Sequence, residues 1–190
     1  MSDFLFENKT AVMSEVPKYC KYAKNHYIQT LTMSCGPTSA ANFAMALMDT
    51  DKLSSEELEK IVHIALKDED SKDAEECLNN AGFEGYGLGK AIAEVIGQPK
   101  ESSVEWTDGN AEMAAETSTR RNPTMMVVQY EAHEHWVVCI GKGDNDKVYF
   151  QDPAHKNEVV VPVETVKEGN YNSDGSSCFK QNGYYSFATH

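Results

Sequence analysis

Five short runs in the second half of the chain are rich in valine and aromatic residues, with Gly, Asp and Asn between them. This composition and this length are typical of β-strands. The expected strands are TMMVVQY (124–130), HWVVCIG (135–141), KVYFQD (147–152), NEVVVPV (157–163) and GYYSFAT (183–189). The second half is therefore expected to fold into an antiparallel sheet.

The first half of the chain carries helical patterns instead. Apolar residues recur at helical spacing after Ser34, and Pro37 fits the first turn of a helix, where its missing N–H costs nothing. This helix is expected to begin close to Cys35. A second helix is expected after Ser54, which forms a capping box with Glu57. Further helices are expected at about 72–80, at 90–99 and at 110–121, with a strand at 102–107.

These elements predict an α+β fold in which an N-terminal helical lobe packs on a C-terminal antiparallel β-sheet. The chain has 190 residues, which is long enough for a substantial core, so residues 1–190 are expected to form a single domain. Residues 1–25 show no strong period and are expected to be a loosely structured lead-in.

The charge of the chain limits its partners. It contains 30 acidic and 17 basic residues, a formal charge of −13. Phosphate binding needs clustered Lys and Arg, and Arg120 and Arg121 alone are too few, so nucleic acid and an anionic membrane are not expected as partners. The sequence has no run of about 18 apolar residues and no signal peptide. We expect a cytoplasmic protein, or one delivered into another cell by a specialised secretion route.

The five cysteines, at positions 20, 35, 77, 139 and 178, are scattered and include no C-x-x-C pair. Neither a zinc ribbon nor a dithiol redox site is therefore supported. Free thiols are the expected state in the absence of a signal peptide, with disulfide formation after export left open. No metal and no cofactor are expected.

Cys35 stands where the first expected helix begins, within YIQTLTMSCGPTSAANFAMAL (27–47). Free cysteines are usually small buried apolar residues, and this is the simplest interpretation. The alternative is a nucleophile, because the dipole of a helix N-terminus and a neighbouring protonated histidine both favour a thiolate.

The strands at 135–141 and 147–152 are separated by KGDND, a polar turn that predicts a hairpin centred near residues 144–145. In that register His135 faces Asp152 or a near neighbour. Directly opposed Cβ atoms lie about 4.5–5.5 Å apart, close enough for a hydrogen bond between imidazole and carboxylate. The carboxylate would then orient the ring and stabilise its protonated form.

If the open end of this hairpin lies against the N-terminus of the helix that begins near Cys35, then Cys35, His135 and Asp152 form a nucleophile, a base and an orienting carboxylate. The side-chain amide of Gln29 and the backbone N–H of Cys35 would then donate to an oxyanion. The simpler interpretations are a packed strand-end histidine for His135, a turn-opening aspartate for Asp152 and a surface amide for Gln29.

Together these motifs resemble a known family. The pattern Q-x5-C-G-P-T-S at the start of a helix, a later H-W-V-V-x-I-G strand and V-Y-F-x-D-P at the end of the hairpin resemble papain-like cysteine peptidases of the bacteriocin-processing, double-glycine leader type. The resemblance covers residues 27–155, with the motifs in the same order and spacing. It implies a papain-like fold, with Cys35 as nucleophile, His135 as general base and acid, Asp152 as orienting residue and Gln29 as oxyanion donor.

The resemblance also implies a thiol protease that hydrolyses a protein or peptide amide bond through an acyl-enzyme, at small residue pairs such as Gly-Gly. Family members fused to export transporters precede a membrane region, which this sequence lacks, so a free-standing domain is expected. Similar free-standing domains are bacterial effectors and toxins that cut or modify proteins. The partners expected on this basis are a protein or peptide substrate and an inhibitory or immunity protein.

Several alternatives remain open from the sequence. HEH at 133–135 places His133 and His135 on one face of a strand, as in a metal pair, although no third ligand follows at useful spacing. His155 is an alternative base, and Cys139 is either a core residue or a second nucleophile. The same triad would also serve a glutamine deamidase or transglutaminase, and a protein-binding module that has lost its chemistry is a further alternative.

Overall fold

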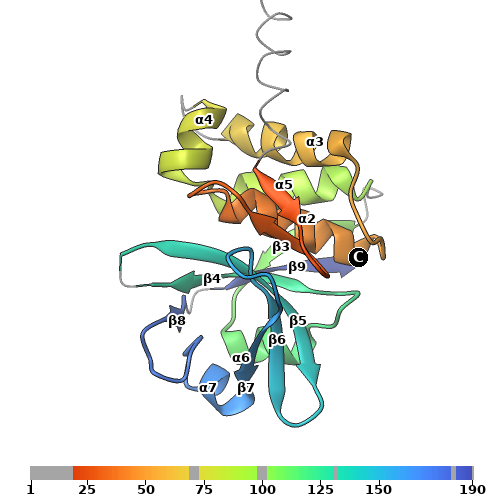
Figure 1. Ribbon diagram of the computed structural model, residues 1–190. Helices are drawn as coiled ribbons and strands as arrows, with labels where there is room; N and C mark the ends of the chain where they lie inside the picture. Colours follow the sequence, from red (N-terminus) through yellow and green to blue (C-terminus); the bar gives the residue numbers. More distant parts are fainter. Residues whose placement is uncertain (1–18, 69–72, 98–101, 131, 181–182, 190) are drawn as a thin grey trace, which may run out of the picture.

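The computed structural model describes residues 19–68, 73–97, 102–130, 132–180 and 183–189. Helices from the first half of the chain lie on one side of an antiparallel sheet that comes mainly from the second half (Figure 1). The predicted α+β fold, with a helical lobe packed on a sheet, is confirmed.

The helical lobe is built around α2. Its elements are α2 (Cys35–Leu47), α3 (Ser55–Ala65), η2 (Leu66–Asp68), α4 (Ala74–Glu76), η3 (Cys77–Ala81) and α5 (Gly85–Val95). Helix α2 lies between the other helices and the sheet and is buried from Cys35 to Met45, so even its polar residues are enclosed (Figure 1). Helix α3 begins at the predicted capping box, in which the Ser54 hydroxyl accepts the Glu57 N–H at 3.2 Å and the Glu57 carboxylate accepts the Ser54 N–H at 2.6 Å.

The main sheet has the strand order β3-β9-β4-β5-β6-β7, with β8 paired to β4. The bounds are β3 (Ser102–Thr107), α6 (Ala111–Thr117), β4 (Thr124–Gln129), β5 (Glu134–Gly143), β6 (Lys147–Gln151), β7 (Val159–Pro162), α7 (Val163–Lys167), β8 (Cys178–Phe179) and β9 (Tyr184–Thr189). Central strand β5 is covered on both faces: Trp136, Val138 and Ile140 join the core of the helical lobe, while Val137 and Cys139 join a second core with α6 and α7. A strand covered on both faces accounts for the unbroken apolar run of HWVVCIG.

The hairpin of β5 and β6 has almost the predicted register. Val138 pairs with Gln151 and Cys139 with Phe150, one residue from the expected positions. The turn contains Asn145 and Asp146 with φ of 68° and 53°, the positive values that a tight hairpin turn requires.

The segment before the first helix differs from the prediction. Strands β1 (Cys20–Tyr22) and β2 (Tyr27–Gln29) form an antiparallel hairpin. Because β1 falls within residues 1–25, the prediction of a lead-in without regular structure is wrong for its described part, and residues 1–18 lie outside the described residues. Strands of three residues are too short to show a periodicity.

Helix α5 begins at Gly85, five residues before the predicted start. Glycines lower the intrinsic helix propensity of its first turns, which conceals the helix in the sequence. Close packing accounts for them, because a Cβ atom on Gly87 would lie 2.7 Å from the Ala65 carbonyl oxygen and one on Gly89 would lie 3.0 Å from the Tyr185 ring.

Three other predicted elements differ in extent. The helix expected at 72–80 is divided into α4 and the π-helical turn η3, the helix expected at 110–121 ends at Thr117, and the strand expected at 157–163 gives way to α7 at Val163. Residues 72, 98 and 99 of the expected helices lie outside the described residues. Helix α7 and strand β8 were not predicted.

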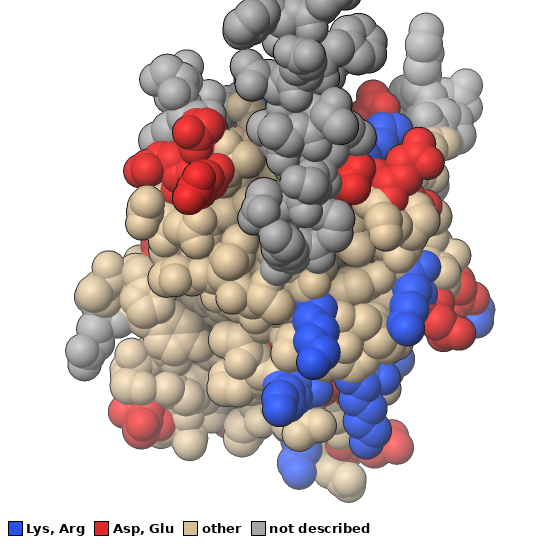
Figure 2. All heavy atoms as spheres, turned by 45° about the horizontal axis from the view of Figure 1, so that its top comes forward, with Lys and Arg blue, Asp and Glu red and all other residues tan. Residues whose placement is uncertain are grey.

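Charged side chains are unevenly distributed. On the face drawn in Figure 2, acidic side chains gather over the helical lobe and a separate group of Lys and Arg lies further down. The two adjacent arginines are both paired: Arg120 binds Glu158 through two hydrogen bonds of 2.7 and 2.9 Å, and Arg121 lies 3.0 Å from Asp49. Within the described ranges, no helix combines the length and apolar character needed to cross a bilayer.

Candidate active site

Cys35 is the first residue of α2 and lies at the wall of a cleft of about 770 Å³. The preceding residue, Ser34, does not cap the helix with its side chain, because its hydroxyl lies 2.9 Å from the carbonyl oxygens of Tyr19 and Leu31. The first turn of α2 therefore keeps uncapped N–H groups, whose partial positive charge favours an anion at this end of the helix.

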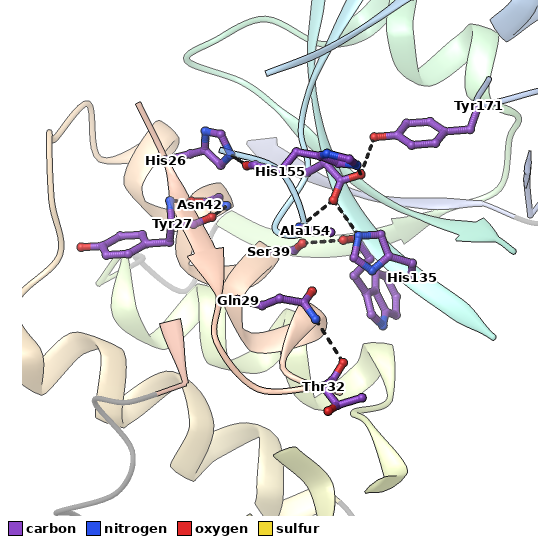
Figure 3. A network of polar contacts seen from close by, with 12 residues as sticks. His26, Tyr27, Gln29, Thr32, Ser39, Asn42, His135, Ala154, His155 and Tyr171 are labelled. Atoms are coloured by element: carbon purple, nitrogen blue, oxygen red, sulfur yellow. Dashed lines mark hydrogen bonds and ion pairs between the residues drawn. The ribbon is translucent and has the colours of Figure 1, made fainter. Parts of the chain in front are cut away.

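His135 stands near the start of β5 and is only 6% exposed. Its Nε2 lies 2.7 Å from Oδ1 of Asp152 (Figure 3), and the Cys35 thiol acts on the same ring and helps to raise its pKa. Burial lowers the pKa of His135, but hydrogen bonds and negative charge from Asp152 and Cys35 outweigh burial and raise this pKa to about 9. The ring is therefore protonated at neutral pH.

Asp152 follows β6 and is fully buried. Its Oδ1 also accepts the N–H of Ala154 at 2.8 Å, and its Oδ2 accepts the hydroxyl of Tyr171 at 2.8 Å (Figure 3). Burial raises the pKa of this carboxyl, but the hydrogen bond and charge of His135 and the donors Ala154 and Tyr171 lower it by more, so the pKa lies below its ordinary value. Asp152 is thus an ionised, firmly oriented carboxylate.

One hydrogen bond fixes the N-terminus of α2 against β5. The Ser39 hydroxyl donates to the carbonyl oxygen of Trp136 at 2.8 Å, one residue from His135. Gly36 allows a close approach to the helical lobe, since a Cβ atom there would lie 3.0 Å from Leu88 in α5 and 3.3 Å from Phe83. Ser39 was not predicted to be a positioning residue.

Gln29, at the end of β2, lies close to the segment that follows Asp152. Its backbone N–H donates to the carbonyl oxygen of Pro153 at 2.7 Å. Its side-chain Nε2 donates to the carbonyls of Leu31 at 3.2 Å and Thr32 at 3.0 Å, and its buried Oε1 has no hydrogen-bond partner among the described residues (Figure 3). In this conformation both amide hydrogens point into the loop, so a role as oxyanion donor requires the amide to turn.

The hairpin that carries Gln29 is attached to α2 by Asn42. The Asn42 side chain accepts the N–H of Tyr27 at 2.7 Å and donates to the carbonyl of Tyr27 at 3.0 Å. Asn42 and Ser39 are fully buried polar residues three positions apart in a largely apolar helix, and this spacing is the sequence signal that could have identified them.

The cleft lies between the helical lobe and the sheet, and aromatic rings form much of its wall. Trp136, next to His135, lies with its ring centroid 6.1 Å from that of Tyr185, which in turn lies 5.0 Å from Trp106 in an edge-on contact. The segment at 81–86, from the last residue of η3 to the first turn of α5, supplies another part of the lining.

The alternative residues are not part of the row of Cys35, His135 and Asp152, although His133 lines the cleft and His155 lies beside Asp152. His133 precedes β5 and stacks on Tyr130 with ring centroids 5.4 Å apart. Cys139 is fully buried in the second core, and burial raises its pKa to about 11. His155 is exposed, with its Nε2 3.9 Å from Oδ2 of Asp152. All five cysteines are free thiols, and no cluster of three or more potential metal ligands occurs within the described residues.

No protein-family model and no curated protein matches the sequence. Among solved structures, the chain is similar to the peptidase domain of Streptococcus ComA, a bifunctional ABC transporter involved in a quorum-sensing pathway. The TM-score is 0.53 at 13% identity, over 90% of this chain and 100% of that domain. The Pseudomonas avirulence protein AvrPphB gives a TM-score of 0.35 at 12% identity, over 82% of this chain and 91% of that protein, which is too low to support an argument.

The similarity to the ComA domain extends over almost the whole chain, although so low an identity relates the two by fold alone. The resemblance seen in the sequence is confirmed at that level: the chain has the papain-like fold, which the ComA peptidase domain shares.

Proposed function

We propose that the chain is a cysteine peptidase that hydrolyses amide bonds in proteins or peptides. The observation that supports this most directly is the hydrogen bond between His135 and Asp152, together with Cys35, which acts on the same imidazole and lies at the wall of the cleft. Acyl transfer by a cysteine requires three groups in this order: a thiol nucleophile, an imidazole base and a carboxylate that orients the imidazole.

The reaction proceeds in two halves. The Cys35 sulfur attacks the substrate carbonyl carbon, and the protonated His135 gives its proton to the departing amine, which leaves an acyl-enzyme. The neutral His135 then takes a proton from water as the water attacks the thioester, and the carboxylic acid and the thiol are released. Asp152 holds the ring by Nε2 throughout and stabilises its protonated form.

Gln29 and the backbone N–H of Cys35 are the proposed donors to the oxyanion of each tetrahedral intermediate. The amide of Gln29 must turn from the carbonyls of Leu31 and Thr32 to do so, and substrate binding in the cleft is the event that would displace it. The backbone bond from Gln29 to Pro153 keeps the residue beside the triad.

Gln29→Ala is expected to lower kcat about 10²- to 10³-fold with little change in KM, because the lost donor acts on the transition state. Steady-state kinetics on a cleaved peptide would measure the change. The matched control is Gln129→Ala, which removes the side-chain amide of a glutamine that lines the cleft. A change in KM alone would contradict the oxyanion role.

The substrate proposal extends to small residues at the scissile bond, such as a Gly-Gly pair. The large rings of Trp136 and Tyr185 line the same cleft as Cys35, and the space that they fill leaves more room for small side chains than for large ones beside the thiol. The further proposal of a bacterial effector or toxin, restrained by an inhibitory or immunity protein, rests on the sequence resemblance alone.

The experiment that tests the function is incubation with a proteome-derived peptide library, followed by mass spectrometry of the new termini. We expect cleavage at a defined sequence by the wild type and none by Cys35→Ala. Conversion of glutamine to glutamate without backbone cleavage would contradict the proposal and indicate a deamidase, and amine incorporation would indicate a transglutaminase.

A further inference from the structure

The carboxylate of Asp152 has a histidine beside each of its oxygens. Oδ1 lies 2.7 Å from Nε2 of His135, and Oδ2 lies 3.9 Å from Nε2 of His155. The hydroxyl of Tyr171 occupies Oδ2 at 2.8 Å (Figure 3). One carboxylate therefore lies between two imidazoles, and only one of them also contacts the nucleophile.

His155 is well placed to compete for this carboxylate. Its backbone N–H bonds to the Asp152 carbonyl at 3.0 Å, and its own carbonyl is 2.9 Å from Nε2 of the buried His26. These bonds fix the main chain beside Asp152, while the imidazole is 58% exposed and free to change rotamer. A shift of about 1 Å would bring the ring within hydrogen-bond range of Oδ2.

Tyr171 is held firmly in the position that prevents this. The residue is 4% exposed, and its backbone N–H donates to the Ser177 carbonyl at 3.0 Å. Its ring makes edge-on contacts with Phe150, 5.3 Å away in β6, and with Phe179, 5.4 Å away in β8. The hydroxyl therefore reaches Oδ2 from a rigid aromatic cluster.

We propose that Tyr171 is a positioning residue, which occupies Oδ2 of Asp152 and so keeps the carboxylate on His135 and away from His155. This inference rests on the proposed cysteine peptidase mechanism. Rotation of the carboxylate toward His155 would break its hydrogen bonds with Tyr171 and Ala154 together. The Tyr171 hydroxyl therefore opposes this rotation of the Asp152 carboxylate. Tyr171 lies outside the stretch that carries the sequence motifs.

The test uses the rate of Cys35 alkylation by iodoacetamide at pH 6, measured by mass spectrometry. Tyr171→Phe keeps the ring and removes the hydroxyl, and it is expected to lower the rate about tenfold, the scale on which a misplaced catalytic group acts. Adding His155→Gln removes the competitor and is expected to restore most of the wild-type rate. Tyr184→Phe is the matched control, because Tyr184 lies buried in the same hydrophobic cluster but is not a donor to Asp152.

The possible outcomes separate this inference from the function on which it rests. Equal rates in wild type and His135→Ala would overturn the peptidase proposal itself. A rate in Tyr171→Phe equal to that of the wild type, when His135→Ala is slow, would overturn the role of Tyr171. A slow Tyr171→Phe that His155→Gln leaves slow would also overturn it, because a merely structural defect is not corrected by removing a competitor. Melting temperatures of all variants verify that they fold.

Discussion

Cys35→Ala is expected to reduce peptide cleavage about 10⁶-fold, because alanine cannot form the acyl-enzyme and loss of a nucleophile removes nearly all of the chemistry of a triad. Binding of the peptide should survive, since the cleft is lined mainly by residues other than Cys35. The measurement is the rate of cleavage of the first peptide identified, with peptide affinity determined separately by fluorescence anisotropy.

Cys139→Ala is the control for this prediction. Cys139 is also a fully buried cysteine, but it lies in the second core, against α6 and α7. Its loss should leave the cleavage rate at that of the wild type and affect only stability. Loss of activity in Cys139→Ala, with Cys35→Ala still active, would contradict the assignment of the nucleophile.

Asp152→Asn is expected to lower kcat about 10⁴-fold, the effect of removing the orienting carboxylate of a triad. The amide keeps the size of the side chain but cannot stabilise the protonated ring or fix its tautomer. The pKa of His135 should fall from about 9 toward the ordinary value of about 6.5, since the charge of Asp152 no longer opposes burial and Cys35 alone still does. The imidazole resonances of His135, followed by NMR against pH, measure this directly, and a midpoint still near 9 in the variant would contradict the account.

The same substitution should change how stability depends on pH. In the wild type the pKa of His135 is higher in the folded state than in the unfolded state, so its protonation contributes stability that is full below about pH 6.5 and lost as the pH rises through about 9. The shift corresponds to on the order of 3 kcal/mol. Urea unfolding at several pH values should show this loss in the wild type and not in Asp152→Asn.

The arrangement of Cys35, His135 and Asp152 could be predicted because the position of each residue depends on local sequence. The turn at KGDND sets the hairpin register within one residue, and this brings His135 and Asp152 to the same open end. Pro37 and the following apolar period fix the start of α2 at Cys35. The contact between the N-terminus of α2 and the sheet was inferred from the residue types that a nucleophile, a base and an orienting carboxylate require. In the structure, the hydrogen bond from Ser39 to Trp136 makes this contact.

The parts that were not predicted depend on contacts between distant segments. Tyr171 reaches Asp152 only after the chain passes through β7 and α7, and no local pattern marks that return. The glycine-rich start of α5 has a low helix propensity. The glycines are explained by close packing, in which Ala65 approaches Gly87 and the Tyr185 ring approaches Gly89. The orientation of the Gln29 amide is likewise decided by the carbonyls of its own loop.

The most direct test of the account is the iodoacetamide alkylation rate of Cys35 between pH 5 and pH 9, in wild type and in His135→Ala. The account predicts that His135→Ala loses most of the wild-type rate at the acidic end of this range, because the sulfur then lacks the protonated imidazole beside it. Identical profiles in the two proteins, each rising with pH like an ordinary free thiol, would contradict the pairing of Cys35 with His135 on which the proposed function rests.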